Sequence, residues 1–153
     1  MIIEFTPQGG QTEILDAGRM RASEVQIIER TADMKWGDVL SGMEDGDITP
    51  IRVVGWVLKK RNNPSLRLVE FDPFDDEVRV RLDAKEVPRY AALLVARLGD
   101  QPDELADAFD ELRDAAFDRE ACELAIKDAT APKVPAPSPE PEPTTADGSP
   151  TDG

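Results

Sequence analysis

Carboxylates are the most frequent side chains in this sequence that could do chemistry. Their densest group is Asp72, Asp75, Asp76 and Glu77. Hard cations prefer several carboxylate oxygens, which makes this group the best candidate for a metal site. It lacks the alternating acidic positions, the sixth-position glycine and the terminal glutamate of a calcium-binding loop, so a solvated acidic turn is the favoured interpretation. No bound metal or cofactor is expected.

Other catalytic groups are scarce. The chain has no histidine, which excludes imidazole as a base, an acid or a metal ligand. The single cysteine, Cys122, can form neither an intramolecular disulfide nor a thiolate zinc site, and it is expected to be a small packed residue. We predict a protein that is not an enzyme and has no catalytic residues. A carboxylate-dependent enzyme stays open only if carboxyls of raised pKa line a pocket.

The charge is strongly negative and unevenly placed. There are 18 Lys and Arg residues against 32 Asp and Glu residues, a net charge of −14. Residues 1–102 hold 14 basic and 18 acidic side chains, whereas residues 103–153 hold 4 and 14. Without clustered basic residues, neither nucleic acid nor an anionic membrane is an expected partner. No apolar run approaches a membrane span and the first residues lack a secretory signal pattern, so a cytoplasmic location is expected.

The composition changes near residue 130. Residues 130–153 contain seven of the 13 prolines and four acidic residues. Such a segment cannot bury enough apolar surface to offset the entropy lost on ordering, so it is predicted to be a disordered, Pro-rich acidic tail. Residues 1–129 are predicted to form one helical domain around one hydrophobic core.

The fold class predicted for this domain is mainly α, with a short N-terminal β-hairpin and minor β structure in the middle of the chain. Alternating or β-branched runs predict strands at 2–5, 12–16 and 78–82. Apolar residues at helical spacing predict helices over 23–32, 36–43, 50–61, 86–98 and 103–128. Ser23 and Thr49 are the expected caps of the first and third helices. The third helix is apolar nearly all round, which places it at the centre of the core.

The last predicted helix carries two apolar stripes. The first consists of Leu105, Phe109, Leu112 and Ala116. The second, Phe117, Ala121 and Leu124, is rotated from it by roughly 100–120° about the helix axis. One interpretation is a bend, or a broad stripe covered by the rest of the domain. The other is that the second stripe faces a partner, which makes Phe117, Ala121 and Leu124 the candidate partner-contact residues.

Two tryptophans, Trp36 and Trp56, lie on apolar helical faces. Burial in the core is the favoured interpretation, because a tryptophan buries a large area, and an aromatic anchor at an interface is the alternative. Lys59, Lys60 and Arg61 are expected to complement the carboxyl end of their helix rather than to contact nucleic acid.

The order of two motifs resembles a known family. The first motif is Ala32-Asp33-Met34-Lys35-Trp36, and the second runs over residues 55–66 as GWVLKKRNNPSL. With the acidic stretch that follows, residues 23–75 are similar to the tail assembly chaperones of long-tailed bacteriophages of actinobacteria. In that family a Gly-Met-x-Trp element precedes a Trp-Val, basic, Arg, x, Pro, Ser-Leu element. Asp33 stands where the family often has glycine, and the family supplies no active-site residue.

The resemblance implies a protein that binds the tape measure protein during tail morphogenesis in the cytoplasm of a bacterial host and is absent from the mature virion. A longer form of the chain, made by a ribosomal frameshift, and a second copy in a homo-oligomer are considered as further partners. Recognition of a helical partner by an apolar stripe needs no titratable catalyst.

The net charge supports a different interpretation, an acidic inhibitor that mimics nucleic acid and binds a basic host protein. This function requires carboxylates arrayed over a continuous folded surface, and it predicts binding that weakens strongly with salt. The concentration of charge in the last helix and the tail counts against it.

Overall fold

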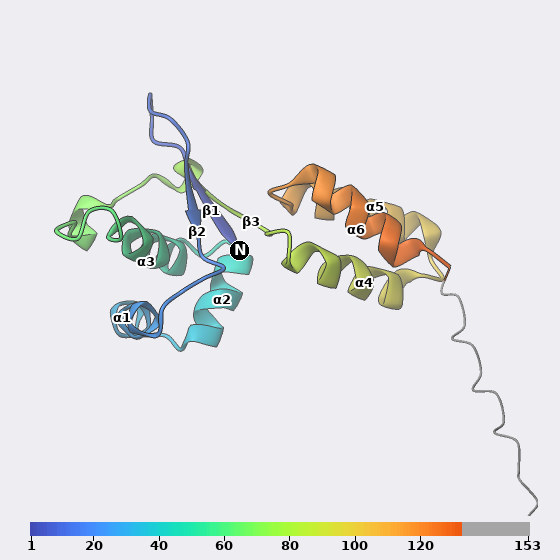
Figure 1. Cartoon of the computed structure of the whole chain (residues 1–153), viewed down its shortest axis with the longest axis horizontal. Coiled ribbons are helices and arrows are strands. Elements are labelled where there is room, and N and C mark those ends of the chain that lie inside the picture. The colour runs from blue at the N-terminus through green and yellow to red at the C-terminus, as the bar shows by residue number, and fades with distance from the viewer. Residues whose placement is uncertain (133–153) are drawn as a thin grey trace, which may run out of the picture.

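The computed structural model describes residues 1–132, which form two lobes that meet at Leu82 (Figure 1). The N-terminal lobe contains β1 (Ile2–Phe5), β2 (Glu13–Asp16), α1 (Ala22–Ala32), α2 (Trp36–Glu44), α3 (Ile48–Lys59), the 3-10 turns η1 (Leu68–Glu70) and η2 (Asp75–Glu77), and β3 (Val78–Arg81). The C-terminal lobe contains α4 (Glu86–Leu98), α5 (Pro102–Ala115) and α6 (Arg119–Thr130). The predicted fold class, mainly α with a hairpin and a mid-chain strand, is confirmed. From residue 133 on, the predicted tail lies outside the described residues.

The sheet has β1 in its centre. The strand order is β2-β1-β3, and both neighbours run antiparallel to β1. Gly9, in the β1–β2 turn, has a φ of 72°, a conformation that glycine adopts without steric cost. Ile3 pairs with Leu15 on one side and with Val80 on the other, so a strand late in the lobe closes the sheet against its first residues.

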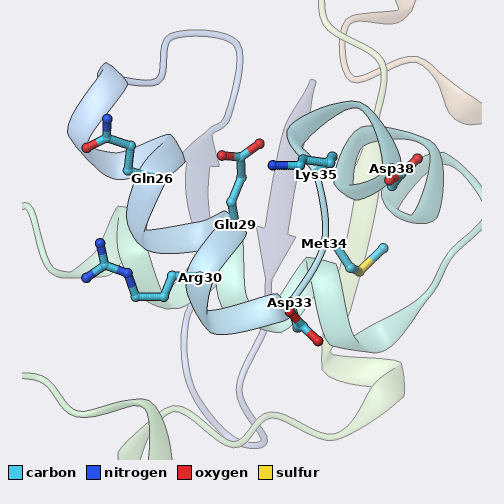
Figure 2. Close-up of a pocket in the computed structure, with 7 residues that line it drawn as sticks. All are labelled: Gln26, Glu29, Arg30, Asp33, Met34, Lys35 and Asp38. Carbon is cyan, nitrogen blue, oxygen red and sulfur yellow. The ribbon is translucent and has the colours of Figure 1, made fainter.

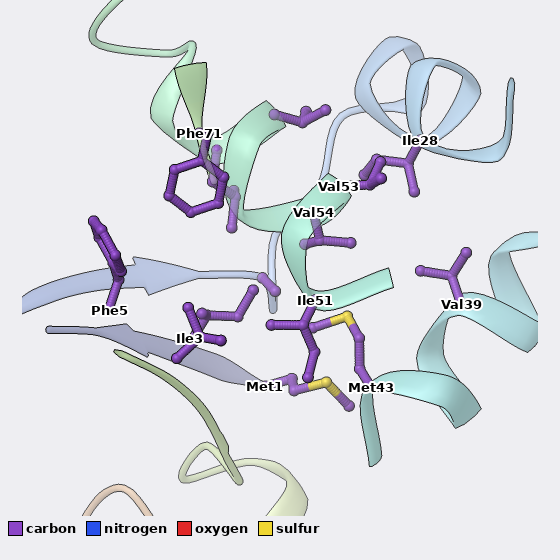
Figure 3. Close-up of a cluster of buried hydrophobic side chains, with 14 residues drawn as sticks. Met1, Ile3, Phe5, Ile28, Val39, Met43, Ile51, Val53, Val54 and Phe71 are labelled. Atoms are coloured by element: carbon purple, nitrogen blue, oxygen red, sulfur yellow. The ribbon is translucent and has the colours of Figure 1, made fainter. Parts of the chain in front are cut away.

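Helix α3 lies at the centre of the N-terminal lobe, as its all-round apolar sequence predicts. Its buried side chains include Ile51 and Val54, which pack with Ile3 and Phe5 from β1 (Figure 3). Phe71 closes this core, with its ring edge on to that of Phe5 at a centroid distance of 5.2 Å. The core therefore joins the sheet to α1, α2 and α3.

The prediction of one hydrophobic core is wrong, because the buried side chains form two clusters. The first belongs to the N-terminal lobe. The second is formed by α4, α5 and α6 and includes Val87, Ala91, Phe109 and Leu112. The apolar stripes of these three consecutive helices bury one another, so the sheet is not needed to cover them.

Two predicted helix starts are displaced by one or two residues. Helix α1 begins after Arg21, whose N–H donates to the Glu24 carboxylate at 2.7 Å, and Ser23 is not the cap. Helix α3 begins after Asp47, so Thr49 lies inside the first turn. Pro50 also lies in that turn, where a missing N–H costs no hydrogen bond.

The prediction of one helix over 103–128 is wrong. Helix α5 ends at Ala115, the chain is extended at Ala116, and α6 starts after Asp118. The Leu82 N–H donates to the Ala115 carbonyl, and the Phe117 N–H donates to the Leu82 carbonyl, both at 2.9 Å. The backbone at the break therefore bonds to the end of β3, and the chain reverses instead of bending. Within residues 1–132, no helix is long and apolar enough to cross a bilayer.

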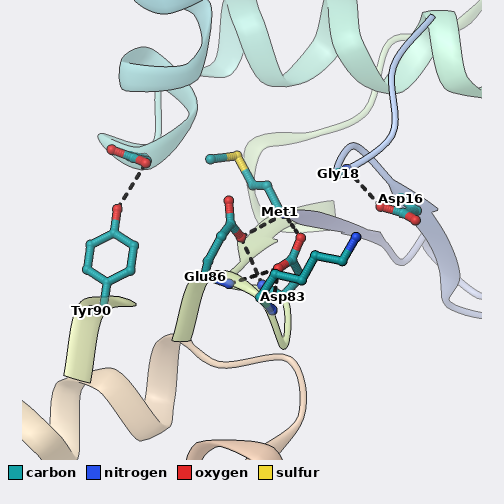
Figure 4. Close-up of polar contacts among 8 residues, drawn as sticks. Met1, Asp16, Gly18, Asp83, Glu86 and Tyr90 are labelled. Atoms are coloured by element: carbon teal, nitrogen blue, oxygen red, sulfur yellow. Dashed lines mark hydrogen bonds and ion pairs between the residues drawn. The ribbon is translucent and has the colours of Figure 1, made fainter. Parts of the chain in front are cut away.

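Polar contacts join the lobes (Figure 4). The Met1 ammonium lies 2.5 Å from Asp83 Oδ2 and 2.7 Å from Glu86 Oε2. Burial opposes the charged form of Asp83, but hydrogen bonds from this ammonium and from two backbone N–H groups outweigh it and lower the pKa of the carboxyl. Across the junction, the Tyr90 hydroxyl donates to Glu44 Oε1 at 3.0 Å. Burial and this carboxylate raise the pKa of Tyr90.

Candidate partner-binding surface

The first motif forms the turn between α1 and α2. Asp33 ends α1 in the left-handed region, with a φ of 54°. Glycine enters this region freely and aspartate does so more readily than most residues, so the position accommodates either. The Glu29 carboxylate accepts the N–H of Trp36 at 2.8 Å, and Met34 and Trp36 pack against the core. The motif therefore positions two helices.

An open hollow of about 780 Å³ lies beside this turn (Figure 2). It is lined by Gln26, Glu29, Arg30, Asp33, Met34, Lys35 and Asp38. Its charged groups are of both signs, and the Glu29 carboxylate is already bonded to the Trp36 N–H. Three of the seven lining side chains are carboxylates and two are basic, and none is a serine, cysteine or histidine.

The second motif fastens the end of α3. A Cβ on Gly55 would lie 3.0 Å from the ring of Phe71, so the glycine lets this ring pack directly on the helix. The Trp56 indole Nε1 donates to the Leu66 carbonyl at 2.9 Å, which ties the following loop to α3. The Lys60 ammonium lies 4.9 Å from the Trp56 ring centroid. Trp36 and Trp56 are half-buried against the N-terminal core, which confirms their packing role.

Arg61, also in this motif, connects α3 to α1. Its Nε and Nη2 donate to the two oxygens of Glu24, each at 2.7 Å. Hydrogen bonding to Arg61 lowers the pKa of the Glu24 carboxyl from 4.5 to about 2, against the opposing effect of burial. Because Glu24 also accepts the N–H of Arg21, one nearly buried carboxylate serves both a helix start and an interhelix ion pair.

No known protein family, curated protein or solved structure matches this chain. The function of this protein is therefore inferred from its own geometry and from its two sequence motifs.

The acidic group at 72–77 does not converge on a point. Asp72 lies 3.2 Å from Arg52 Nη2, whereas Glu77 accepts the backbone N–H groups of Gln8 at 2.6 Å and of Phe74 at 2.9 Å. Within the described residues, no three acidic or cysteine side chains gather as a metal ion would require. The carboxyls whose pKa shifts are Glu24, Glu70, Asp83 and Glu123, and all four shift downward. These shifts favour charged, structural carboxylates over general acids.

The three candidate partner-contact residues lie at the start of α6. Phe117 precedes the helix and is 44% exposed, Ala121 is half-buried, and Leu124 is 58% exposed. The buried face of α6 is instead formed by Cys122, Ala125 and Ile126. The second stripe therefore lies outside the core, while Cys122 is a packed residue whose thiol pKa is raised by burial.

Helix α4 contributes apolar surface that the sequence analysis missed. Its inner face carries Val87 and Ala91, but Ala92, Leu93 and Ala96 on its outer side are exposed. The outer side of α4 is therefore apolar between Arg89 and Arg97. The sequence does indicate this apolar surface, because the run from Ala91 to Ala96 contains no polar residue.

Helix α5 presents a different surface. Six exposed carboxylates lie within about 120° of its circumference. They are Asp103, Glu104, Asp107, Asp110, Glu111 and Asp114. Of the six, Asp110 forms an ion pair, with Arg113 on the same helix at 2.7 Å. The C-terminal lobe thus exposes an acidic face on α5 and apolar side chains on α4 and α6.

Proposed function

We propose that this protein is a tail assembly chaperone of a long-tailed bacteriophage, that it binds the tape measure protein in the cytoplasm of the host bacterium, and that it is absent from the mature virion. The proposal includes no enzymatic activity. The observation that carries it is the order of the two motifs, whose residues have defined scaffold roles. Asp33 makes the α1–α2 turn, Gly55 receives Phe71, and Arg61 holds Glu24.

The apolar surface of the C-terminal lobe supports the same proposal. A chaperone of a long helical protein needs exposed apolar side chains that bind a helix, and surrounding charge that keeps the complex dissolved. Phe117 and Leu124 supply the first feature and the acidic face of α5 supplies the second.

The test is co-expression of the full chain with the tape measure protein, which we expect to be the product of a very long, helix-rich gene just downstream. We expect the tape measure protein to stay dissolved and to co-purify with the chaperone. An unrelated acidic protein of similar size is the control for non-specific solubilisation. An insoluble tape measure protein together with no co-purification would end the proposal.

The proposed partners also include a longer frameshifted form of the chain and a second copy of it. Mass spectrometry of infected cells is expected to find a larger product that shares the N-terminal peptides of this chain. Its absence throughout infection would remove the frameshifted form while leaving the chaperone role intact.

The acidic face of α5 favours one other function, an inhibitor that mimics nucleic acid and binds a basic host protein. It predicts that the chain displaces a labelled duplex from a purified nucleoid protein of the host, and that displacement is lost at high salt. Replacing Asp103, Asp107, Asp110 and Asp114 with asparagine would then abolish displacement. If the wild-type chain displaces no duplex at low salt, this function is excluded.

A further inference from the structure

Helices α4 and α6 start at the same place and run side by side (Figure 1). The Phe117 N–H, just before α6, donates to the carbonyl of Leu82, just before α4. Both helices then lead away from the sheet. Helix α5 links them in the sequence and runs in the opposite direction. Parallel neighbours of this kind present a long shared surface.

The orientation of α6 follows from one ion pair. Arg113 of α5 donates to Glu123 at 2.7 Å, so the Glu123 flank of α6 faces α5. Ala121 lies about 160° round the helix from Glu123 and therefore faces away from α5, towards α4. Leu124 lies about 60° from Ala121, on the outer side.

The orientation of α4 follows in the same way. Tyr90 shares a hollow with Ala115, the last residue of α5, so the Tyr90 flank is near α5. Pro88, Ala92 and Val95 lie about 140–160° round the helix from Tyr90 and face α6. With Phe117, Ala121 and Leu124 they form what we call the α4–α6 strip.

The strip is apolar, and residues 1–132 leave most of it uncovered. Val95 and Ala121 are half-buried and form its floor, whereas the other four residues are exposed. Contiguous exposed apolar surface on a small domain marks an interaction site more often than scattered apolar residues do. Small side chains at Ala92 and Ala121 allow another helix to approach closely.

The two edges of the strip carry opposite charge. Lys85 and Arg89 lie on the α4 edge, one turn apart. On α6, Glu120 lies on the outer side of Leu124, one turn before it. Asp128 lies one turn after Leu124, between Leu124 and Ala121 round the helix, and closes the far end of the strip. Among residues 1–132, these four side chains take part in none of the ion pairs.

We infer that the α4–α6 strip binds an amphipathic helix of the partner, with acidic residues along the flank that meets Lys85 and Arg89 and basic residues along the flank that meets Glu120 and Asp128. Reversing a helix exchanges its flanks, so the charged edges also select the direction in which the partner runs. This inference rests on the proposed function only for the partner's identity, a helix of the tape measure protein.

The test uses the full chain and a fluorescent synthetic helix of about 21 residues, with a leucine stripe, glutamates on one flank and lysines on the other. Leu124→Glu disrupts the strip. Leu93→Glu is the matched control, because Leu93 is 55% exposed and lies about 60° from Tyr90, off the strip. By anisotropy, Leu124→Glu is expected to weaken binding at least about tenfold and Leu93→Glu less than about twofold. Circular dichroism checks that both variants fold.

Two further peptides test the charged edges, one with glutamates and one with lysines on both flanks. Each meets one edge of like charge, so both are expected to bind several-fold more weakly than the mixed peptide at low salt, with the difference shrinking at high salt. Equal binding of all three peptides, equal effects of the two leucine variants, or no saturable binding of the mixed peptide would each overturn the inference.

The same variants separate this inference from the proposed function. If the tape measure protein co-purifies with wild type and with Leu124→Glu equally, the chaperone role stands and the strip is not its site. If the peptides behave as expected but the tape measure protein is not retained, the strip stands and the partner is a different helical protein.

Discussion

The two lobes differ in the ion pairs that stabilise each of them. In the N-terminal lobe, ion pairs join residues far apart in the sequence, such as Arg61 with Glu24, Lys59 with Glu13 and Arg81 with Glu4. In the C-terminal lobe, the pairs made by Arg113 stay within a helical hairpin. The motif residues stabilise the N-terminal lobe from within, whereas the partner-binding strip that we propose lies on α4 and α6.

Spectroscopy can follow the lobes separately. Both tryptophans, Trp36 and Trp56, belong to the N-terminal lobe, and the only tyrosine, Tyr90, belongs to α4. Tryptophan emission therefore reports on the scaffold, whereas far-ultraviolet circular dichroism reports on helices in both lobes.

The largest expected effect is at Val54, which is fully buried in α3. Val54→Asp places an unpaired charge in the N-terminal core and is expected to cost more than about 4 kcal/mol, enough to unfold that lobe. Tryptophan emission should shift to that of exposed indole while part of the helical circular dichroism remains. Complete loss of the helical signal would show that the lobes form one cooperative unit.

Glu24→Ala is expected to destabilise the N-terminal lobe by about 3 kcal/mol. It leaves the Arg61 guanidinium without its carboxylate partner and removes the acceptor of the Arg21 N–H. Urea unfolding followed by tryptophan emission measures the loss. Glu70→Ala is the matched control, because its pair with Arg67 is exposed and local, and its effect on the urea midpoint should be much smaller.

Acid should weaken the same lobe. The pKa of the Glu24 carboxyl is lowered from 4.5 to about 2, so the folded lobe holds this group charged where the unfolded chain would protonate it. Its contribution, about 3 kcal/mol, is complete above pH 4.5 and disappears as the pH falls towards 2. Urea midpoints measured across this range should fall less in Glu24→Gln than in wild type. Parallel curves would contradict the assignment.

Asp118→Ala tests the C-terminal lobe. The Asp118 carboxylate accepts the Ala121 N–H at 3.0 Å and caps α6, so its loss should cost about 1 kcal/mol. The change should lower the helical transition and leave the tryptophan transition within error. A matching shift in both would mean that the lobes unfold together.

The smallest effect is a gain. Asp107 lies four residues from both Asp103 and Glu111 on the acidic face of α5, where like charges repel. Asp107→Lys turns two repulsive pairs into attractive ones and should stabilise the lobe by about 0.5 kcal/mol at low salt. Thermal unfolding with and without added salt measures it, and a gain that persists at high salt would point to a different cause.

Local patterns predicted most elements of the fold. Apolar spacing located the helices, and alternation located the strand at 78–82, because each signal lies within one element. The partner of that strand was not predictable, since the pairing of Val80 with Ile3 joins distant residues. The division into two cores is also a tertiary property that the total apolar content does not encode.

The helix break was missed for a different reason. Asp118 caps α6, but it is one of ten acidic residues in 103–128. The sequence therefore did not distinguish this cap from the other carboxylates. The rotated stripe of Phe117, Ala121 and Leu124 was a real signal of that break. The exposed face of α4 was overlooked because only its inner apolar stripe was followed. Whether Phe117, Ala121 and Leu124 contact a partner stays a prediction.

The pairing of β3 with β1 sets the order in which the molecule can form. During synthesis β1 emerges from the ribosome long before its partner β3. The sheet therefore stays incomplete until Arg81 has left the ribosome. The second hydrophobic cluster is instead formed by residues that follow this strand. Any product that shares the first 81 residues therefore carries all three strands of the sheet, whatever the ribosome adds afterwards.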